Sequence, residues 1–265
     1  MFGIHGCLYP NTATAFGLDD IGLYEGLFVD RFATYIRELV DDRVFSPTAF
    51  HAFREDVWNP GSPFLDLLNL RYFIVPREEA IPPEQQAALS LRPVYEGEVR
   101  IYERMNALPR AMIRHRTDFV ADDGQILRAL RGGYDVRRAV ILKGTAPPAP
   151  PAAVDPIEGG SSVLSESYGV NRKAFRVRMA QEGFLVVNDV QYPGWRAEVD
   201  GRPAPLWTAN YLFQAVRVPA GEHRVSLRFD PWSLRAGIVL SLVTLAALLA
   251  WARAGRRKAR AIPDG

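Results

Sequence analysis

The polar and apolar residues of this chain follow three successive patterns. Up to about Lys143, short helical and strand-like patterns are mixed. From Ser161 to Phe229, apolar residues recur at every second position, which is typical of strands with one buried face. An uncharged, apolar run from Ala236 to Ala252 follows, and basic residues end the chain. The patterns predict an α+β fold: a mixed unit, then a strand-rich domain, then a hydrophobic helix.

The strand-rich part predicts an antiparallel β-sandwich of immunoglobulin-like size. Asp200-Gly201 is a strong signal for a tight hairpin, and Pro219-Ala-Gly221 marks another turn. Cys7 is the only cysteine, so no intrachain disulfide can connect the two sheets. The predicted strands are Ser162–Tyr168, Ala174–Met179, Phe184–Asp189, Trp195–Val199, Ala204–Thr208, Leu212–Val218 and His223–Phe229.

Residues 1–143 predict a small α+β unit. Gly22–Val40 carries apolar residues at helical spacing, and Ser62-Pro63 suits the start of a short helix, Phe64–Asn69. A short helix is predicted after Pro82-Pro83, and another over Asp122–Leu130. Predicted strands are Arg71–Val75, Val94–Glu96, Arg100–Glu103, Ala111–Arg114 and Ala139–Leu142. Residues 144–156 are rich in Pro and Ala and predict an extended linker.

The apolar run near the C-terminus predicts a transmembrane helix over residues 231–252. As a helix, Ala236–Ala252 spans roughly 26 Å at about 1.5 Å per residue, near the lower limit for crossing a bilayer. Trp232 and Trp251 suit the two membrane interfaces. A buried core helix is the alternative. The run has no polar face, however, and this favours the membrane.

The charges around this helix predict its orientation. The tail, residues 253–265, is strongly basic, which favours a cytoplasmic tail and an extracytoplasmic body. Arginines also precede the helix, but most belong to the predicted folded domain. The N-terminus has neither a basic region nor an apolar stretch of a signal peptide. We therefore expect this chain to be the last part of a longer membrane protein, whose earlier spans deliver the body to the outside.

Composition excludes several classes of protein. The formal net charge is only +2, and the basic tail accounts for it, so no nucleic-acid surface is indicated. The four histidines, His5, His51, His115 and His223, lack metal-ligand spacing, so neither a metal nor a cofactor is expected. No phosphate-binding glycine loop and no nucleophile elbow is present. A soluble hydrolase is therefore not supported by any motif.

Few residues suggest chemistry. Asp19-Asp20 is an acidic pair that could bind a cation or serve as acid and base, although a solvated turn is the commoner role. Asn188-Asp189 offers a single carboxylate at a predicted strand end. Tyr192, Trp195 and Trp207 could form an aromatic platform for a sugar ring, or could fill the core between the sheets. We expect Trp195 to be structural and Tyr192 to be the better surface candidate.

A series of short motifs resembles the C-terminal region of the bacterial YfhO-like membrane proteins. In the second half these motifs are Gly183-Phe-Leu-Val-Val-Asn-Asp189, Tyr192-Pro-Gly-Trp195, Val199-Asp-Gly201, Ala209-Asn210, Val218-Pro-Ala-Gly-Glu-His223 and Phe229-Asp-Pro231. In the first half they are Tyr9-Pro-Asn-Thr-Ala13, Phe16-Gly-Leu18, Asp66-Leu-Leu-Asn-Leu-Arg-Tyr72 and Ala107-Leu-Pro-Arg-Ala111. Each motif is short, and their common order carries the resemblance.

The resemblance implies a role in glycan transfer at the cell envelope. The family is similar to multi-spanning glycosyltransferases of the GT-C type, which use lipid-linked sugars. In such enzymes the catalytic acid lies in an early loop between membrane spans, and this chain has no such loop. We therefore expect no catalytic residue here. We expect membrane lipid, a lipid-linked sugar or envelope glycan, and the remaining transmembrane part of the same protein or a neighbour as partners.

Two functions remain open on the sequence. The first is an extracytoplasmic module of residues 1–143 and 157–230 that assists transfer of a lipid-linked sugar to an envelope polymer. The second is a membrane-anchored glycan-binding or assembly protein without transferase activity. Many apolar spans encoded upstream of Met1 would favour the first function.

Overall fold

The computed structural model describes residues 1–3, 12–21, 29–41, 61–145 and 160–260 of the 265-residue chain. Several expectations fall outside these residues. They concern Cys7, His5 and His51, the first part of the 22–40 helix, most of the 144–156 linker and the last five residues of the tail.

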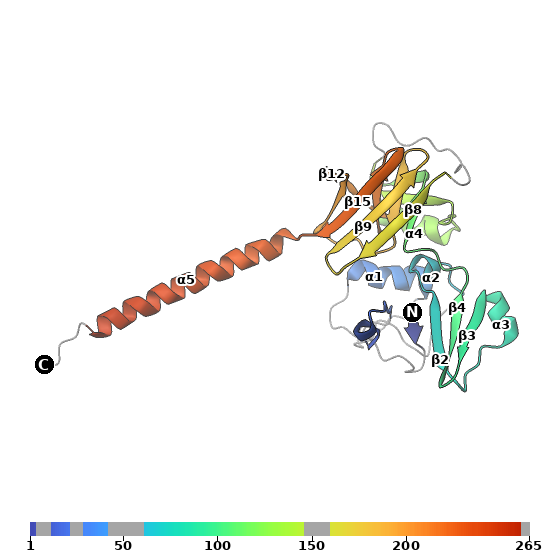
Figure 1. Ribbon diagram of the computed structural model, residues 1–265, viewed down its shortest axis with the longest axis horizontal. Coiled ribbons are helices and arrows are strands. Elements are labelled where there is room, and N and C mark those ends of the chain that lie inside the picture. The colour runs from blue at the N-terminus through green and yellow to red at the C-terminus, as the bar shows by residue number, and fades with distance from the viewer. Residues whose placement is uncertain (4–11, 22–28, 42–60, 146–159, 261–265) are drawn as a thin grey trace.

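A small four-stranded sheet lies at one end of the body (Figure 1). Its strands, in spatial order, are β1 (Phe2–Gly3), β2 (Tyr72–Pro76), β4 (Val99–Arg104) and β3 (Leu91–Glu96). β2, β4 and β3 pair antiparallel, and α3 (Pro83–Ala88) connects β2 to β3. Phe73 and Val75 alternate with more exposed residues along β2, so one face of this sheet is buried. β3 and β4 form a hairpin around Gly97, and they contain the predicted strands Val94–Glu96 and Arg100–Glu103.

Short helices separate this sheet from the rest of the body (Figure 1). A 3₁₀ helix, Thr12–Phe16, comes first. α1 (Asp30–Tyr35) continues into a π-helical turn, Ile36–Val40, and α2 (Phe64–Leu67) packs nearby. Residues at helical spacing, Phe32, Tyr35, Ile36 and Leu39, are buried as their pattern predicts.

The larger part of the body is a sandwich of two sheets. The six-stranded sheet has the order β5 (Ala111–Arg114), β10 (Gly183–Val187), β14 (Phe213–Val218), β13 (Leu206–Ala209), β7 (Ala139–Lys143) and β6 (Arg116–Val120). The five-stranded sheet has the order β12 (Arg202–Ala204), β11 (Trp195–Val199), β15 (Gly221–Phe229), β9 (Arg172–Met179) and β8 (Ser162–Tyr168). The α+β fold with an antiparallel sandwich is therefore confirmed.

The six-stranded sheet is covered on both faces. β10 is buried along its whole length: Leu185 and Val187 face the five-stranded sheet, while Phe184 and Val186 pack with the core that includes the helices. This double burial explains why β10 is a continuous apolar run, whereas β9 on the outer sheet alternates strictly.

The sandwich crosses the predicted boundary at residue 143. β5, β6 and β7 come from the first segment, yet β5 pairs with β10 over four residues and β7 pairs with β13. β6 and β7 run parallel and are connected by α4 (Asp123–Arg131), whose N-terminus is capped by Asp122. No strand was predicted over β6, because its outward residues Arg116 and Asp118 mask the pattern on this edge strand.

One predicted strand, Ala204–Thr208, is two strands in the structure. β12 ends at Ala204 in the five-stranded sheet, and β13 begins at Leu206 in the six-stranded sheet. Pro205 stands between them and cannot donate a ladder hydrogen bond, so the chain changes sheets at this residue. Ser162–Tyr168 and Trp195–Val199 match their predicted bounds.

The hairpin predicted at Asp200-Gly201 is confirmed. Val199 pairs with Arg202, and the two turn residues have φ of 51° and 75°, as a type I′ turn requires. The carboxylate of Asp200 accepts hydrogen bonds from the Arg224 backbone N–H at 2.8 Å and lies 2.7 Å from His223 Nδ1.

We expect Gly201→Val to lower the free energy of unfolding by about 1–3 kcal/mol. No atom lies within 4 Å of a Cβ built at Gly201, so the loss comes from backbone strain at positive φ. Thermal unfolding of the full chain in detergent measures it. Gly201→Asn is the control, since asparagine tolerates this conformation, and equal melting temperatures for the two variants would contradict the turn's role.

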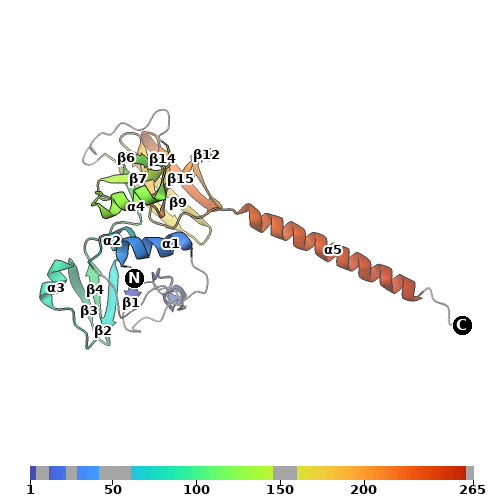
Figure 2. The ribbon, with the colours of Figure 1, turned by 180° about the vertical axis from the view of Figure 1, so that it is seen from behind.

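A long helix, α5 (Trp232–Arg260), projects away from the body (Figures 1 and 2). Trp232–Arg253 has a mean hydropathy of 2.0, and none of its most apolar stretch is buried. These 22 residues span about 33 Å, enough to cross a bilayer. The alternative of a buried core helix is therefore wrong, and the predicted span, 231–252, agrees within one residue at each end.

Candidate functional site

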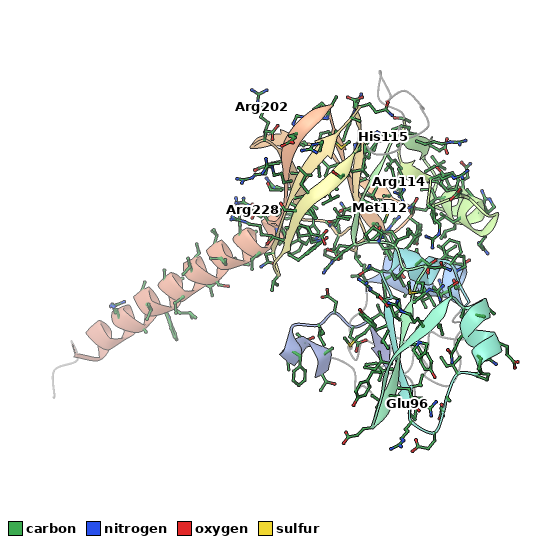
Figure 3. The ribbon with its side chains drawn as sticks, turned by 45° about the vertical axis from the view of Figure 1, so that its right-hand side comes forward. Glu96, Met112, Arg114, His115, Arg202 and Arg228 are labelled. Carbon is green, nitrogen blue, oxygen red and sulfur yellow. The ribbon has the colours of Figure 1, made fainter. Side chains whose placement is uncertain are left out.

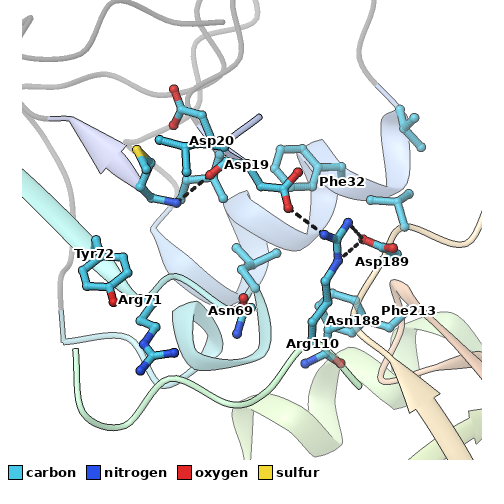
Figure 4. A pocket seen from close by; sticks show the side chains of 16 residues that line it. Asp19, Asp20, Phe32, Asn69, Arg71, Tyr72, Arg110, Asn188, Asp189 and Phe213 are labelled. Carbon is cyan, nitrogen blue, oxygen red and sulfur yellow. Dashed lines mark hydrogen bonds and ion pairs between the residues drawn. The ribbon is translucent and has the colours of Figure 1, made fainter. Parts of the chain in front are cut away.

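A cavity of about 560 Å³ opens where the N-terminal segment, the small sheet and the sandwich meet (Figure 4). Polar and apolar side chains share its wall. The polar ones are Asp19, Asp20, Asn69, Arg71, Arg110, Asn188 and Asp189, and the larger apolar or aromatic ones are Phe32, Leu68, Tyr72 and Phe213. Residues far apart in the sequence thus build one concave surface of the size that small ligands occupy.

Arg110 connects the two carboxylates of the cavity wall (Figure 4). Its Nη1 lies 2.6 Å from Asp19 Oδ2, and its Nη2 lies 2.9 Å from Asp189 Oδ1. Its guanidinium carbon lies 4.1 Å from the centre of the Tyr168 ring. Burial alone lowers the pKa of Arg110, but Asp189 and Asp19 more than offset this, so the pKa lies above its ordinary value.

Lys173 extends this network beneath the cavity wall. Its side chain is 5 % exposed, and its Nζ lies 2.5 Å from Asp189 Oδ2 and 3.2 Å from Gln214 Oε1. The Nζ also lies 4.1 Å from the centre of the Trp195 ring. Burial lowers the pKa of Lys173, and the attraction of Asp189 offsets this only in part. Asp189 is therefore held between two cations.

Asn188 lines the cavity and carries a buried acceptor. The residue is buried, at 7 % exposure, and its Nδ2 donates to Pro109 O at 3.4 Å. Its Oδ1 has no hydrogen-bond partner among the residues that the structure describes. Because a buried unpaired acceptor is costly, Oδ1 suits a donor supplied by a bound molecule.

Strand register explains how this site forms. β5 begins at Ala111, which pairs with Val187, the last residue of β10. Arg110 and Asn188 therefore lie side by side beyond the paired residues, and the Asn188 N–H donates to Arg110 O at 2.7 Å. Arg110 and Asn188 both belong to motifs that carry the YfhO-like resemblance. Neither Arg110 nor Lys173, however, was predicted from the sequence as a site residue.

The three predicted aromatic residues do not form one platform. Tyr192, 47 % exposed, and Trp195, half-buried, both pack against Phe229, with ring centres 6.4 and 5.5 Å away. Trp207 lies in the other sheet, packing against Phe119 and Phe184 on the opposite core. The reason is the change of sheets at Pro205, which separates β11 from β13. Tyr192 stays a candidate for sugar contact at the rim of the sandwich.

Asp19-Asp20 does not act as an isolated acidic pair, because Asp19 is paired with Arg110. Within the described ranges, no group of three or more His, Cys, Asp or Glu side chains is arranged to hold a metal ion. His115 lies against Ser161 Oγ at 2.9 Å, and His223 against Asp200, so these two histidines have separate surroundings.

An exposed apolar helix of membrane-spanning length, joined to a β-sandwich, is typical of a membrane-anchored protein. Residues 169–241 match the family model described as bacterial membrane protein YfhO. The resemblance predicted from the motifs is thereby confirmed for this stretch, which runs from just before β9 into α5 and includes Lys173, Asn188 and Asp189. No curated protein and no solved structure matches the chain.

Proposed function

We propose that this chain is the extracytoplasmic C-terminal module of a YfhO-like membrane protein, and that its cavity binds a sugar during transfer from a lipid carrier to an envelope polymer. Bond breaking belongs to another part of the assembly. The glycosyltransferase context comes from the family resemblance, and the binding role comes from the cavity of this chain.

The unpartnered Oδ1 of buried Asn188 carries the proposal. Oδ1 is covered in this structure, so a sugar hydroxyl would donate to it after a small turn of the Asn188 side chain; Asn69 and Arg71 also line the cavity. Phe32 and Tyr72 provide an apolar and aromatic surface for the carbon skeleton of the ring. Planar polar groups combined with such a surface suit an uncharged, hydroxyl-rich ligand.

The cavity is better suited to binding than to catalysis. Its carboxylates at Asp19 and Asp189 already accept hydrogen bonds from Arg110, and Asp189 is also paired with Lys173. Neither is placed as a free general acid or base for glycosyl transfer.

Binding of glucose and N-acetylglucosamine, free and linked to polyprenyl phosphate, tests the proposal. With the full chain in nanodiscs, we expect Asn188→Leu to weaken binding of the recognised sugar about tenfold or more, because the buried acceptor is lost. Asn106→Leu is the matched control, since Asn106 is exposed, does not line the cavity and bonds only to Ser90 Oγ through its amide. Equal affinities of parent and Asn188→Leu, with unchanged melting, would contradict the proposal.

The rim residue Tyr192 is tested separately. If it extends the site toward a polymer, Tyr192→Ala folds normally and loses affinity for the glycan chain while keeping affinity for the single sugar. A Tyr192→Ala variant that folds and binds polymer like the parent would remove Tyr192 from the proposed site.

The second candidate, a glycan-binding or assembly protein without a transferase role, uses the same cavity. Purification from the native membrane distinguishes the two. A multi-spanning transferase that co-purifies, or that precedes this chain in one polypeptide, supports the first function.

A further inference from the structure

Three arginines form a row across the end of the five-stranded sheet from which α5 leaves. Arg228 on β15 pairs in register with Arg196 on β11 and with Arg172 on β9. All three side chains are exposed, and Figure 3 places Arg228 beside the start of α5. We refer to Arg172, Arg196 and Arg228 as the arginine row. Arg235, on the first turn of α5, lies close by through their common partner, Asp230.

Positive charge at this row is only partly compensated. Asp230 Oδ2 lies 3.0 Å from Arg228 and 2.5 Å from Arg235. Arg172 and Arg196 form no ion pair with any residue in the described part of the chain. Like charges directly opposite each other in a sheet repel, so an anion bound between these arginines would stabilise the arrangement.

The other end of the same sheet face shows the contrast. There, Glu222 lies between two arginines, with its carboxylate oxygens 2.7 Å from Arg178 and 3.1 Å from Arg176. Arg176 and Arg178 thus share a carboxylate of the sheet itself, whereas Arg172 and Arg196 have no such partner in the described part of the chain.

Apolar side chains accompany the arginine row. Val170, in the turn between β8 and β9, is 93 % exposed, and Trp232 at the start of α5 is 76 % exposed. The Phe229 N–H donates to Asn171 O at 3.0 Å, which fixes this turn at the same end of the sheet. Exposed tryptophan beside arginine is typical of a membrane interface.

We infer that the arginine row, together with Arg235, binds the phosphate groups of anionic phospholipids in the leaflet that α5 enters. Only three residues separate Arg228 from Trp232, a path of at most about 14 Å. The headgroup region beyond the hydrocarbon is about 5–8 Å thick, and flexible arginine stems extend toward it. Guanidinium groups match phosphate oxygens in two-pronged hydrogen bonds. This inference requires only that α5 spans the membrane and does not depend on sugar binding.

Lipid selectivity in nanodiscs tests the inference. The full chain is placed in equal mixtures of phosphatidylcholine and phosphatidylglycerol, and the lipids retained on extraction are counted by native mass spectrometry. We expect phosphatidylglycerol to be enriched about five- to tenfold, less so at high salt. Arg172→Gln with Arg196→Gln should bring the retained lipids close to the mixture ratio.

Two pairs of control substitutions distinguish the effect of the arginine row from the effect of total charge. Arg202→Gln with Arg224→Gln removes the same charge from exposed positions farther from α5, where Figure 3 shows Arg202, and should keep the enrichment. Arg172→Lys with Arg196→Lys should keep much of it. If the first glutamine pair does not fold, Arg196→Gln alone is measured. An even lipid ratio in the parent, an unchanged ratio in the variant with Arg172→Gln and Arg196→Gln or in Arg196→Gln alone, or an equal loss in the distant pair overturns the inference.

Discussion

Asp66→Asn should lower the free energy of unfolding by about 3–5 kcal/mol, because it removes the charge of a buried carboxylate that pairs with a buried arginine. The side chains of Asp66 and Arg104 are 6 % and 4 % exposed, and Arg104 Nε lies 2.5 Å from Asp66 Oδ1. The second carboxylate oxygen lies 2.7 Å from Arg137 Nη2. Asp66 therefore joins α2 to the small sheet and to the segment before β7.

Thermal unfolding of the full chain in detergent measures this loss, with a fall in melting temperature on the order of 10 °C. Glu222→Gln is the control, because Glu222 also joins two arginines but lies on the exposed face of the outer sheet. It should change the melting temperature little. Equal melting temperatures for the two variants would show that burial of the Asp66–Arg104 pair does not increase its contribution to stability.

Gly194→Ala should lower the free energy of unfolding by about 2–4 kcal/mol, through strain and crowding together. Gly194 has a φ of 113°, which side-chain-bearing residues rarely adopt. A Cβ there would lie 2.9 Å from Phe229 Cε2 and 3.1 Å from Pro231 Cα. The second contact is with backbone just before α5, so it cannot be relieved by a side-chain rotation alone.

The matched control is Gly201→Ala. Gly201 also has positive φ, at 75°, but its Cβ would have no atom within 4 Å. It should therefore cost only about 1 kcal/mol, and the difference between the two variants isolates the crowding near Pro231. Hydrogen exchange at Asp230, whose N–H donates to Gly194 O at 2.8 Å, should rise only in Gly194→Ala. Similar melting temperatures for both variants would show that the backbone at Pro231 can shift enough to accommodate the added Cβ.

The sequence was most informative where structure depends on neighbouring residues. The strand-like local patterns located β8 and β11 to the residue, and the Asp200-Gly201 turn follows from two adjacent residues that accept positive φ. The apolar run located the membrane helix. Pairing between distant segments was not visible. Nothing local in Ala111–Arg114 indicates that it pairs with a strand that begins about 70 residues later, at Gly183.

The candidate site shows the same limit. Asp19 and Asp189 were noticed as carboxylates, but Arg110 brings them together across gaps of 91 and 79 residues. The register between β5 and β10 places Arg110 next to Asp189, and this register is a property of the folded sheet that the local sequence does not show. The aromatic platform failed as a single cluster for a related reason: the proximity of Trp195 and Trp207 in the sequence does not reveal that Pro205 directs them to different sheets.

Because the connection between the sandwich and α5 is short, the orientation of the body depends on the orientation of α5 in the membrane. Only Asp230 and Pro231 stand between β15 and α5, and Asp230 is bonded to Gly194 on one side and to Arg235 on the other. So short a joint leaves little freedom for the body to swivel. A helix adjusts its tilt to bilayer thickness, and here a change in tilt turns the whole body with it. The distance of the cavity from the lipid surface, and the direction in which the cavity opens, then depend on the thickness of the bilayer.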